Sequence, residues 1–379
     1  MAASSGGPLP PGPARSPCAI RTCGSPGPPR VRPWWLRAAR QACFCGGSCS
    51  SAARAGELPE IPDLEVAREI LTPRIVGRTV RGVEVNRADL VRTGTASVAT
   101  LVGDEFRGIG RRGQYLALSF ASGRHLLISL GRWGWLWHGS RGHPPTSATD
   151  LRLSWDDGSD LRLIEGRSPR RAGAWVTSDL ATADPLSKLG WEPLSREFTA
   201  EAFRSLVQGK RRQLKEILTD QTVIAGIGDA YADEILFQAK LSAIRYAHTL
   251  TADEVSALRE AIPATLRWAI GEIRTRAKGA LFERDFRDFL HVHGRKGAPC
   301  VECGTTIAEI LYDAVRTNYC PLCQNVGGYA SRPIPHPASS LCEDSPRSLQ
   351  LRGEDRNPAV GRGPLGWTSW IQQATGAPL

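Results

Sequence analysis

Two pairs of cysteines near the end of the chain constrain its fold more than any other feature. Cys300 and Cys303 form one C-x₂-C pair, and Cys320 and Cys323 form a second pair after sixteen intervening residues. Each pair can place two thiolates on one turn, and two such pairs complete a tetrahedral Zn²⁺ site. Because all four positions are cysteines, no coordination position stays open for a substrate. The spacing therefore predicts one structural zinc ion in a ribbon-like finger.

The remaining cysteines lie near the two ends of the chain. Five fall between residues 18 and 49, and the last is Cys342. A disulfide scaffold would spread its cysteines through a small chain, so this distribution favours a reduced, intracellular protein with one metal site. The 379 residues allow two or three domains. No run of 18 apolar residues occurs, so we expect no membrane-spanning segment.

The basic charge is concentrated where the sequence looks least folded. The formal net charge is +10, and residues 1–57 hold seven arginines against one glutamate. These residues are rich in Pro, Gly, Ala and Arg and lack both helical periodicity and a continuous apolar run. We expect a disordered or mis-annotated extension there, favoured over an organelle-targeting segment. Residues 326–379, rich in Pro, Ser, Gly and Arg, are expected to form a disordered tail.

A second local signal occupies residues 220–234. Good helix formers fill residues 212–218 before it, and apolar residues recur every fourth position after it. Between them lie Gly226 and Gly228, which indicate a loop. A turn that opens a helix presents free backbone N–H groups and the positive end of the helix dipole, which together bind anions such as phosphate. The alternative interpretation is a tight turn between two packed helices.

The string from 220 to 234 resembles the helix–two-turn–helix of the formamidopyrimidine/endonuclease VIII family of DNA glycosylases. Residues 58–66, Leu-Pro-Glu-Ile-Pro-Asp-Leu-Glu-Val, are similar to the opening of that family, in which removal of the initiator Met exposes Pro followed by Glu. By this resemblance Pro59 is the nucleophile and Glu60 its acid/base partner. The resemblance covers residues 58–325 and implies damaged double-stranded DNA as the partner.

The family implies an α+β fold. We expect an N-terminal β-sandwich lobe with a leading helix, a C-terminal helical helix–two-turn–helix domain and a four-Cys zinc-ribbon finger. The expected boundaries are a catalytic β-sandwich domain at 58–190, the DNA-binding helical domain at 191–290 and the finger at 291–325. The family also implies a monomer located in the cytoplasm, in a bacterial-type, nucleoid-associated setting.

The implied activity is removal of oxidised bases from DNA, followed by abasic-site lyase chemistry through an N-terminal proline imine. A free secondary amine can attack a sugar carbon, whereas the same nitrogen inside a peptide bond is an amide and cannot. Met1 is the only methionine, so we expect that translation begins at codon 58 or that processing exposes Pro59.

Several family positions carry different residues in this chain. Gln114, Arg132 and Ala172 stand where the family has a DNA-contacting Lys, a gap-filling Met and an intercalating Phe. Arg132 is a candidate to wedge or stack in place of the Met. Asp229 replaces an Asn that donates to a backbone phosphate, and an ionised Asp can only accept. These departures favour an alternative, a DNA-binding protein of the same fold whose catalysis is altered or lost. Retention of the Pro-Glu pair favours the enzyme.

The resemblance also gives a set of positions expected to contact DNA. They come from the β-rich lobe, from the helix–two-turn–helix and from the finger, where Val315 stands in the matching place and the candidate Arg follows it. The set is Gln114, Arg132, Arg170, Arg171, Lys215, Gly226, Gly228, Asp229 and Arg316.

Alternation and helical periodicity give further expectations. Residues 115–120 and 125–130 read as the two strands of a hairpin. The alternating Trp133, Trp135 and Trp137 read either as one strand face in the sandwich core or as a side-chain wedge for DNA. The later helices are expected at about 252–277 and 282–289.

Overall fold

A computed structural model of the chain describes residues 58–283, 285–312 and 315–324, all within one compact unit, Ala55–Leu379. The extension expected at 1–57 and the tail expected at 326–379 lie outside the described residues. In the described part of the chain, no helix has the length and apolar character needed to cross a membrane.

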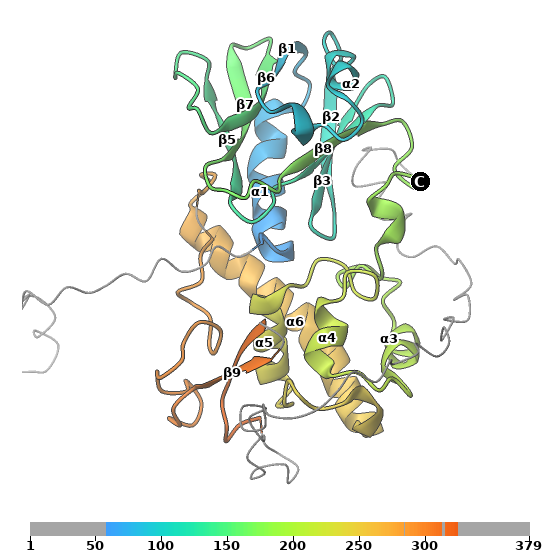
Figure 1. Ribbon diagram of the computed structural model, residues 1–379, viewed down its shortest axis with the longest axis vertical. Coiled ribbons are helices and arrows are strands. Elements are labelled where there is room, and N and C mark those ends of the chain that lie inside the picture. Colours follow the sequence, from blue (N-terminus) through green and yellow to red (C-terminus); the bar gives the residue numbers. More distant parts are fainter. Residues whose placement is uncertain (1–57, 284, 313–314, 325–379) are drawn as a thin grey trace, which may run out of the picture. The chain divides into compact units, whose positions relative to one another are not determined.

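The described chain begins with helix α1, Ile61–Ile75 (Figure 1). Pro62 suits its first turn, and Asp63 caps the helix by accepting a hydrogen bond from the Glu60 N–H at 3.0 Å. The helix supplies side chains to two hydrophobic cores. Ile61 belongs to the core of the helical part, and Leu71 to the core of the β-rich part. The first helix therefore joins the two parts of the molecule.

Two antiparallel four-stranded sheets follow, with strand orders β1-β6-β7-β5 and β2-β3-β4-β8 (Figure 1). Leucine and isoleucine side chains from both sheets share one core, which makes a β-sandwich. The strands are β1 Val80–Val85, β2 Phe106–Arg112, β3 Tyr115–Phe120, β4 His125–Ser129, β5 Gly134–Ser140, β6 Thr149–Trp155, β7 Ser159–Glu165 and β8 Gly173–Thr177. The short helices of this lobe are η2 Ala88–Leu90 and α2 Thr95–Ala99.

The predicted hairpin is confirmed as β3 and β4, which pair antiparallel. The prediction that the alternating tryptophans face the core is wrong. Gly134 and Leu136 are the buried residues of β5, and Leu136 pairs with Leu163 in the core row. Trp135 and Trp137 therefore lie half-exposed on the opposite face. Alternation shows which residues share a face of a strand, but the neighbouring strands decide which face is buried.

The second part is helical. Helix α6 is capped at Thr251, whose hydroxyl accepts the Glu254 N–H, so the helix expected at 252–277 is confirmed. The helix expected at 282–289 is wrong, because the described residues of this segment adopt no helix. Arg287 instead forms a two-bond ion pair with Asp63 on α1, at 2.8 and 2.9 Å. The helices are η3 Leu186–Lys188, α3 Ala200–Val207, α4 Leu214–Thr219, α5 Asp229–Gln238, η4 Ala247–Thr249 and α6 Ala252–Ala277.

The last described unit is a hairpin of β9, Ala308–Tyr312, and β10, Val315–Tyr319, flanked by the two cysteine pairs. The predicted α+β architecture is thus confirmed. It comprises a β-sandwich lobe after a leading helix, a helix–two-turn–helix region and a four-cysteine hairpin.

Candidate active site and DNA-binding surface

The first two residues of the expected catalytic motif lie at the junction between the lobe and the helical part. Pro59 is buried, and Glu60 is 1 % exposed. The Glu60 carboxylate accepts the N–H of Gly228 at 2.5 Å and that of Ala230 at 3.1 Å. Both donors belong to the start of α5, where free N–H groups and the helix dipole favour a negative charge. The anion at this helix N-terminus is therefore the protein's own carboxylate.

Close packing explains the glycines of this turn. A Cβ on Gly228 would lie 2.7 Å from the Glu60 carboxyl carbon, and a Cβ on Gly226 would lie 2.4 Å from an Ile61 side-chain carbon. Gly226 also has a φ of 89°, which glycine adopts readily. Its N–H donates to the Gln221 side chain at 2.7 Å. The N–H groups of both glycines thus already have partners within the protein.

A buried ion-pair network supports the turn that carries Gln114. Glu192 accepts the Gly113 N–H at 3.1 Å and the Arg111 guanidinium at 2.9 and 3.2 Å. Burial lowers the pKa of Arg111, but Glu192 and Glu65 outweigh it and raise that pKa above its ordinary value. Arg111 therefore stays charged. Gln114 is half-buried at the tip of this turn, and the adjacent Gly113 lies close to Ala225 and Gly226, which lead into α5.

A small cavity lies against Pro59. Its volume is about 20 Å³, which is room for roughly one water molecule. One wall comes from the lobe and includes Leu130, Gly134 and Trp135. The other wall comes from the segment after α6 and includes Phe282. A nucleobase could enter here only if these walls moved apart.

Two turns of the lobe meet beside this cavity. A Cβ on Gly131 would lie 2.6 Å from the Ala172 backbone nitrogen and 2.8 Å from the Arg171 carbonyl carbon. Gly131 also has a φ of 63°. Only glycine suits this position, because the contact is with backbone. Arg132 and Arg171 are both exposed here, so two expected DNA contacts share one rim.

Two buried carboxylates bind the residues of this rim from inside the lobe. Glu165, which is fully buried, accepts the N–H groups of Arg171 and Ala172, each at 2.9 Å. Asp150, also fully buried, accepts Arg87 at 3.0 Å and Arg170 at 2.8 Å. The Arg170 side chain is therefore held by an ion pair within the lobe, whereas the Arg171 side chain is exposed to solvent.

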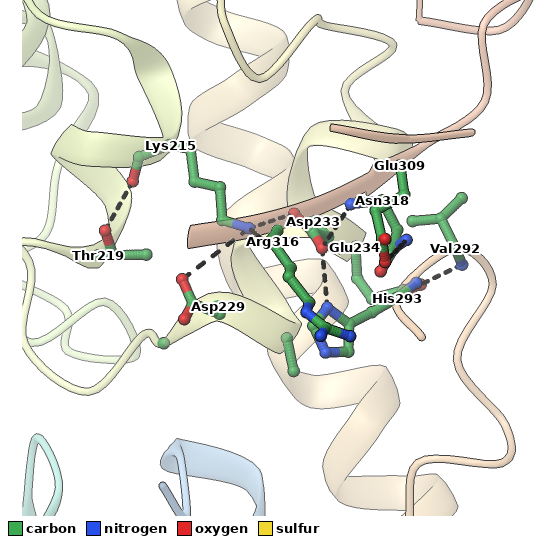
Figure 2. Close-up of polar contacts among 12 residues, drawn as sticks. Lys215, Thr219, Asp229, Asp233, Glu234, Val292, His293, Glu309, Arg316 and Asn318 are labelled. Atoms are coloured by element: carbon green, nitrogen blue, oxygen red, sulfur yellow. Dashed lines mark hydrogen bonds and ion pairs between the residues drawn. The ribbon is translucent and has the colours of Figure 1, made fainter. Parts of the chain in front are cut away.

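A second network joins the helix–two-turn–helix to the cysteine hairpin (Figure 2). The Lys215 ammonium donates to Asp233 Oδ1 and to the Arg316 carbonyl, each at 2.7 Å, and lies 3.9 Å from Asp229 Oδ1. The other Asp233 oxygen accepts the Asn318 N–H at 3.0 Å. Lys215 is buried, while Arg316 is exposed.

Comparison with known proteins identifies the family. The N-terminal domain model of formamidopyrimidine-DNA glycosylase matches residues 58–175, and the H2TH domain model of the same enzyme matches residues 189–278. A formamidopyrimidine-DNA glycosylase from Roseiflexus sp. is 36 % identical over 284 residues, covering 70 % of this chain and all of the relative. The chain belongs to the formamidopyrimidine-DNA glycosylase family.

Further relatives agree. A family member from Geobacillus kaustophilus is 34 % identical and is covered over its whole length. The crystal structure of the Lactococcus lactis FPG protein with FAPY-dG-containing DNA has a TM-score of 0.64 and 26 % identity, covering 70 % of this chain and all of that chain. The same protein bound non-covalently to abasic-site DNA has a TM-score of 0.63, with 26 % identity and coverage of 70 % and 99 %. The predicted family is confirmed.

The four cysteines of this family member come together. Their sulfur atoms all lie within 4.8 Å of one another, and Cys300 and Cys320 are buried. A hydrogen bond with Thr305 lowers the pKa of Cys303 to about 6, so this sulfur is readily available as a thiolate. Four sulfur donors in one cluster match the ligand set that Zn²⁺ prefers.

Sequence reasoning missed the groups that hold these sites together. Neither Asp233 nor Glu234 is among the site residues expected from the sequence. In this glycosylase fold the Glu234 carboxylate accepts three consecutive N–H groups, from His291, Val292 and His293. Burial raises the pKa of Glu234, although these donors pull it down. The available signal was two adjacent acids in the interior of an apolar helix.

Proposed function

We propose that the protein is a DNA repair glycosylase with abasic-site lyase activity that removes oxidised bases from damaged double-stranded DNA. One observation carries this proposal. Pro59 lies against the cavity, and the carboxylate of the next residue, Glu60, is fixed on the first N–H groups of α5. The residues of the family's opening motif are therefore anchored to its helix–two-turn–helix.

In the proposed reaction the nitrogen of Pro59 acts as a secondary amine. It forms a bond to C1′ of the damaged nucleoside while the glycosidic bond breaks, and the departing base takes up a proton. The amine then gives up its proton, the C1′–O4′ bond breaks and the ring oxygen takes up a proton to become a hydroxyl on C4′, which leaves an iminium between Pro59 and the opened sugar. Glu60 is the adjacent group proposed to donate and accept these protons. Removal of a C2′ proton from the iminium then expels the 3′ phosphate.

This chemistry requires a free nitrogen on Pro59. In the printed chain that nitrogen is an amide bonded to Leu58. We therefore propose that the active form begins at Pro59, through a start at codon 58 or through processing. The family model begins to match at residue 58, which supports this start.

One structural Zn²⁺ is proposed at the four cysteines. The ion would close the finger and so fix the hairpin that carries Arg316 and Asn318. With four sulfur ligands it would leave no position for a substrate.

The DNA surface is proposed to use the exposed Arg132, Arg171 and Arg316 on phosphates. The remaining DNA positions stay predictions, because the structure pairs several of them within the protein; they are Gln114, Arg170, Lys215, Gly226, Gly228 and Asp229. We further propose a monomer in a bacterial-type cytoplasm, with the domain boundaries near residues 190, 290 and 325.

Borohydride trapping on duplex DNA tests the activity. The coding sequence would start with Met in place of Leu58, so that removal of Met exposes Pro59. This protein should become covalently attached to DNA containing an abasic site, and Pro59→Gly should sharply weaken the attachment. The full chain with Met1 intact is the matched control and should not trap. Binding without trapping in every form would instead favour the DNA-binding protein with lost catalysis.

A further inference from the structure

An enzyme that extrudes a nucleotide must offset the lost base stacking, usually by inserting a side chain into the gap. The rim beside Pro59 holds no apolar wedge at the positions given by the sequence motifs. Ala172 is fully buried, so it cannot reach a base pair, and Arg132 carries a charge. The filling side chain must therefore come from elsewhere on the rim.

The structure separates the three tryptophans of this region. Trp137 lies beneath the Arg162 guanidinium at 4.3 Å, and Arg162 is itself 3 % exposed and donates to the His143 carbonyl at 2.6 Å. The His143 ring also lies 5.8 Å from the Trp137 ring, so contacts within the lobe hold this indole. Trp135 lines the cavity next to Pro59. Neither is placed to enter a base stack.

Trp133 differs from both. It lies in the turn before β5 and is half-exposed, and the Arg167 guanidinium lies 4.7 Å from its ring centroid. Arg167 is exposed. An indole with a guanidinium on one face is an aromatic platform with a positive charge beside it, which suits both a base and the neighbouring phosphate.

The position of Trp133 relative to the cavity is fixed by its neighbours. Leu130 and Gly134, three residues before and one after, both line the cavity with Pro59. Gly131 contacts the backbone of the turn that ends in Ala172. Trp133 therefore lies in the turn at the rim of the same cavity in which the reaction is proposed, and its ring is half-exposed.

The turn that carries Arg167 is held rigidly. It begins directly after Glu165, whose carboxylate accepts the N–H groups of Arg171 and Ala172, and Arg87 donates to the Ala172 carbonyl at 2.9 Å. These hydrogen bonds fix the backbone at the end of the turn that carries Arg167, so this segment is ordered before DNA arrives.

We propose that Trp133, backed by Arg167, is the wedge that fills the base stack when the damaged nucleotide leaves the duplex. The indole stacks in the gap and the guanidinium supports its other face. This inference rests on the proposed function, since it assigns the gap-filling side chain of that same site.

Binding of the full chain to DNA tests the wedge without requiring a free Pro59. The probe is a duplex with a tetrahydrofuran abasic analogue opposite 2-aminopurine, compared with the undamaged duplex. Trp133→Ala should weaken binding to the abasic duplex about 10- to 100-fold, the size expected for one lost stacking contact. It should change binding to undamaged duplex less than about 3-fold, and it should abolish the 2-aminopurine fluorescence change on binding.

Three variants complete the test. Trp133→Phe should restore most of the abasic preference, and Arg167→Ala should lose part of it. Trp137→Phe, in the stack with the buried Arg162, is the matched control and should bind like the wild type. Thermal unfolding checks that each variant folds; should Trp133→Ala fail to fold, Trp133→Gln replaces it, with the same loss expected because a polar amide provides no apolar stacking surface.

The outcomes separate the two proposals. A wild-type chain that does not prefer the abasic duplex contradicts the proposed function. A wild-type chain with that preference, together with a folded Trp133→Ala or Trp133→Gln variant that keeps it, overturns the wedge.

Discussion

The turn before α5 and the rim of the β-lobe are built in opposite ways. At the turn the polar groups face inward, because the N–H groups of Gly226 and Gly228 bind Gln221 and Glu60. At the rim the carboxylates lie inside, and arginines such as Arg171 face solvent. The first arrangement fixes reacting groups in one geometry, and the second leaves charge available for a partner.

This difference shows why a basic residue in a recognised motif does not by itself identify a phosphate contact. Lys215 and Arg171 were both expected to bind phosphate. The structure gives Lys215 two partners inside the protein, Asp233 and the Arg316 carbonyl, while the Arg171 side chain remains exposed. The predictions below test whether this contrast holds in solution.

The largest effect is expected from removing the proposed zinc. Cys300→Ser should lose the metal, loosen the hairpin and weaken DNA binding at least about 100-fold, because structural zinc supplies a large share of folding energy in small metal-bound units. Metal analysis and DNA binding measure this, with Cys342→Ser as the control expected to keep both. A metal-free variant with full affinity would contradict the structural role.

The next effect concerns the inward-facing turn. Gly228→Ala places a Cβ 2.7 Å from the Glu60 carboxyl carbon, so it should displace that carboxylate and lower borohydride trapping about 100-fold. Gly271→Ala is the control. Its Cβ meets nothing within 4 Å on helix α6, so it should stabilise the protein by about 1 kcal/mol without affecting trapping. Equal trapping by the two variants would contradict the role assigned to the Glu60 carboxylate at this turn.

Replacing Lys215 separates a tether from a phosphate contact. Lys215→Met leaves the buried Asp233 without its ammonium partner, so the free energy of unfolding should fall by about 3 kcal/mol. The slope of log DNA-binding constant against log salt concentration, called the salt slope below, should stay unchanged. A slope reduced by about one, at unchanged stability, would show that Lys215 neutralises a phosphate instead.

The smallest effect is expected at the rim. Arg171→Ala should leave stability within about 0.5 kcal/mol and reduce the salt slope by about one. Arg170→Ala offers a paired comparison, because it removes a partner of the buried Asp150. The Arg170→Ala variant should have a lower free energy of unfolding and an unchanged salt slope of DNA binding. The reverse pattern would exchange the roles assigned to these two neighbours.

Local sequence patterns predicted what depends on local structure. The cysteine spacing predicted the cluster, since each pair folds on one turn. The helix at about 252–277 was predicted from helical periodicity, and in the structure the capping box of Thr251 and Glu254 fixes where it begins. The hairpin of β3 and β4 was predicted from alternation around Ser122-Gly123.

What the sequence could not show is which distant groups pair. Glu60 and Gly228 are 168 residues apart, and Arg87 and Glu165 are 78 apart. No periodicity reports such pairs. The wrong helix at 282–289 has the same origin, because the ion pair between Arg287 and Asp63 overrides a local helical pattern.

The central claim is that the nitrogen of Pro59 performs the chemistry. Its most direct test is to trap the protein from its native source on abasic-site DNA with borohydride, digest it, and locate the attached sugar by mass spectrometry. The account predicts a chain that begins at Pro59 and carries the sugar on that nitrogen. Attachment to a lysine, or trapping by a chain that still carries residues 1–57, would contradict it.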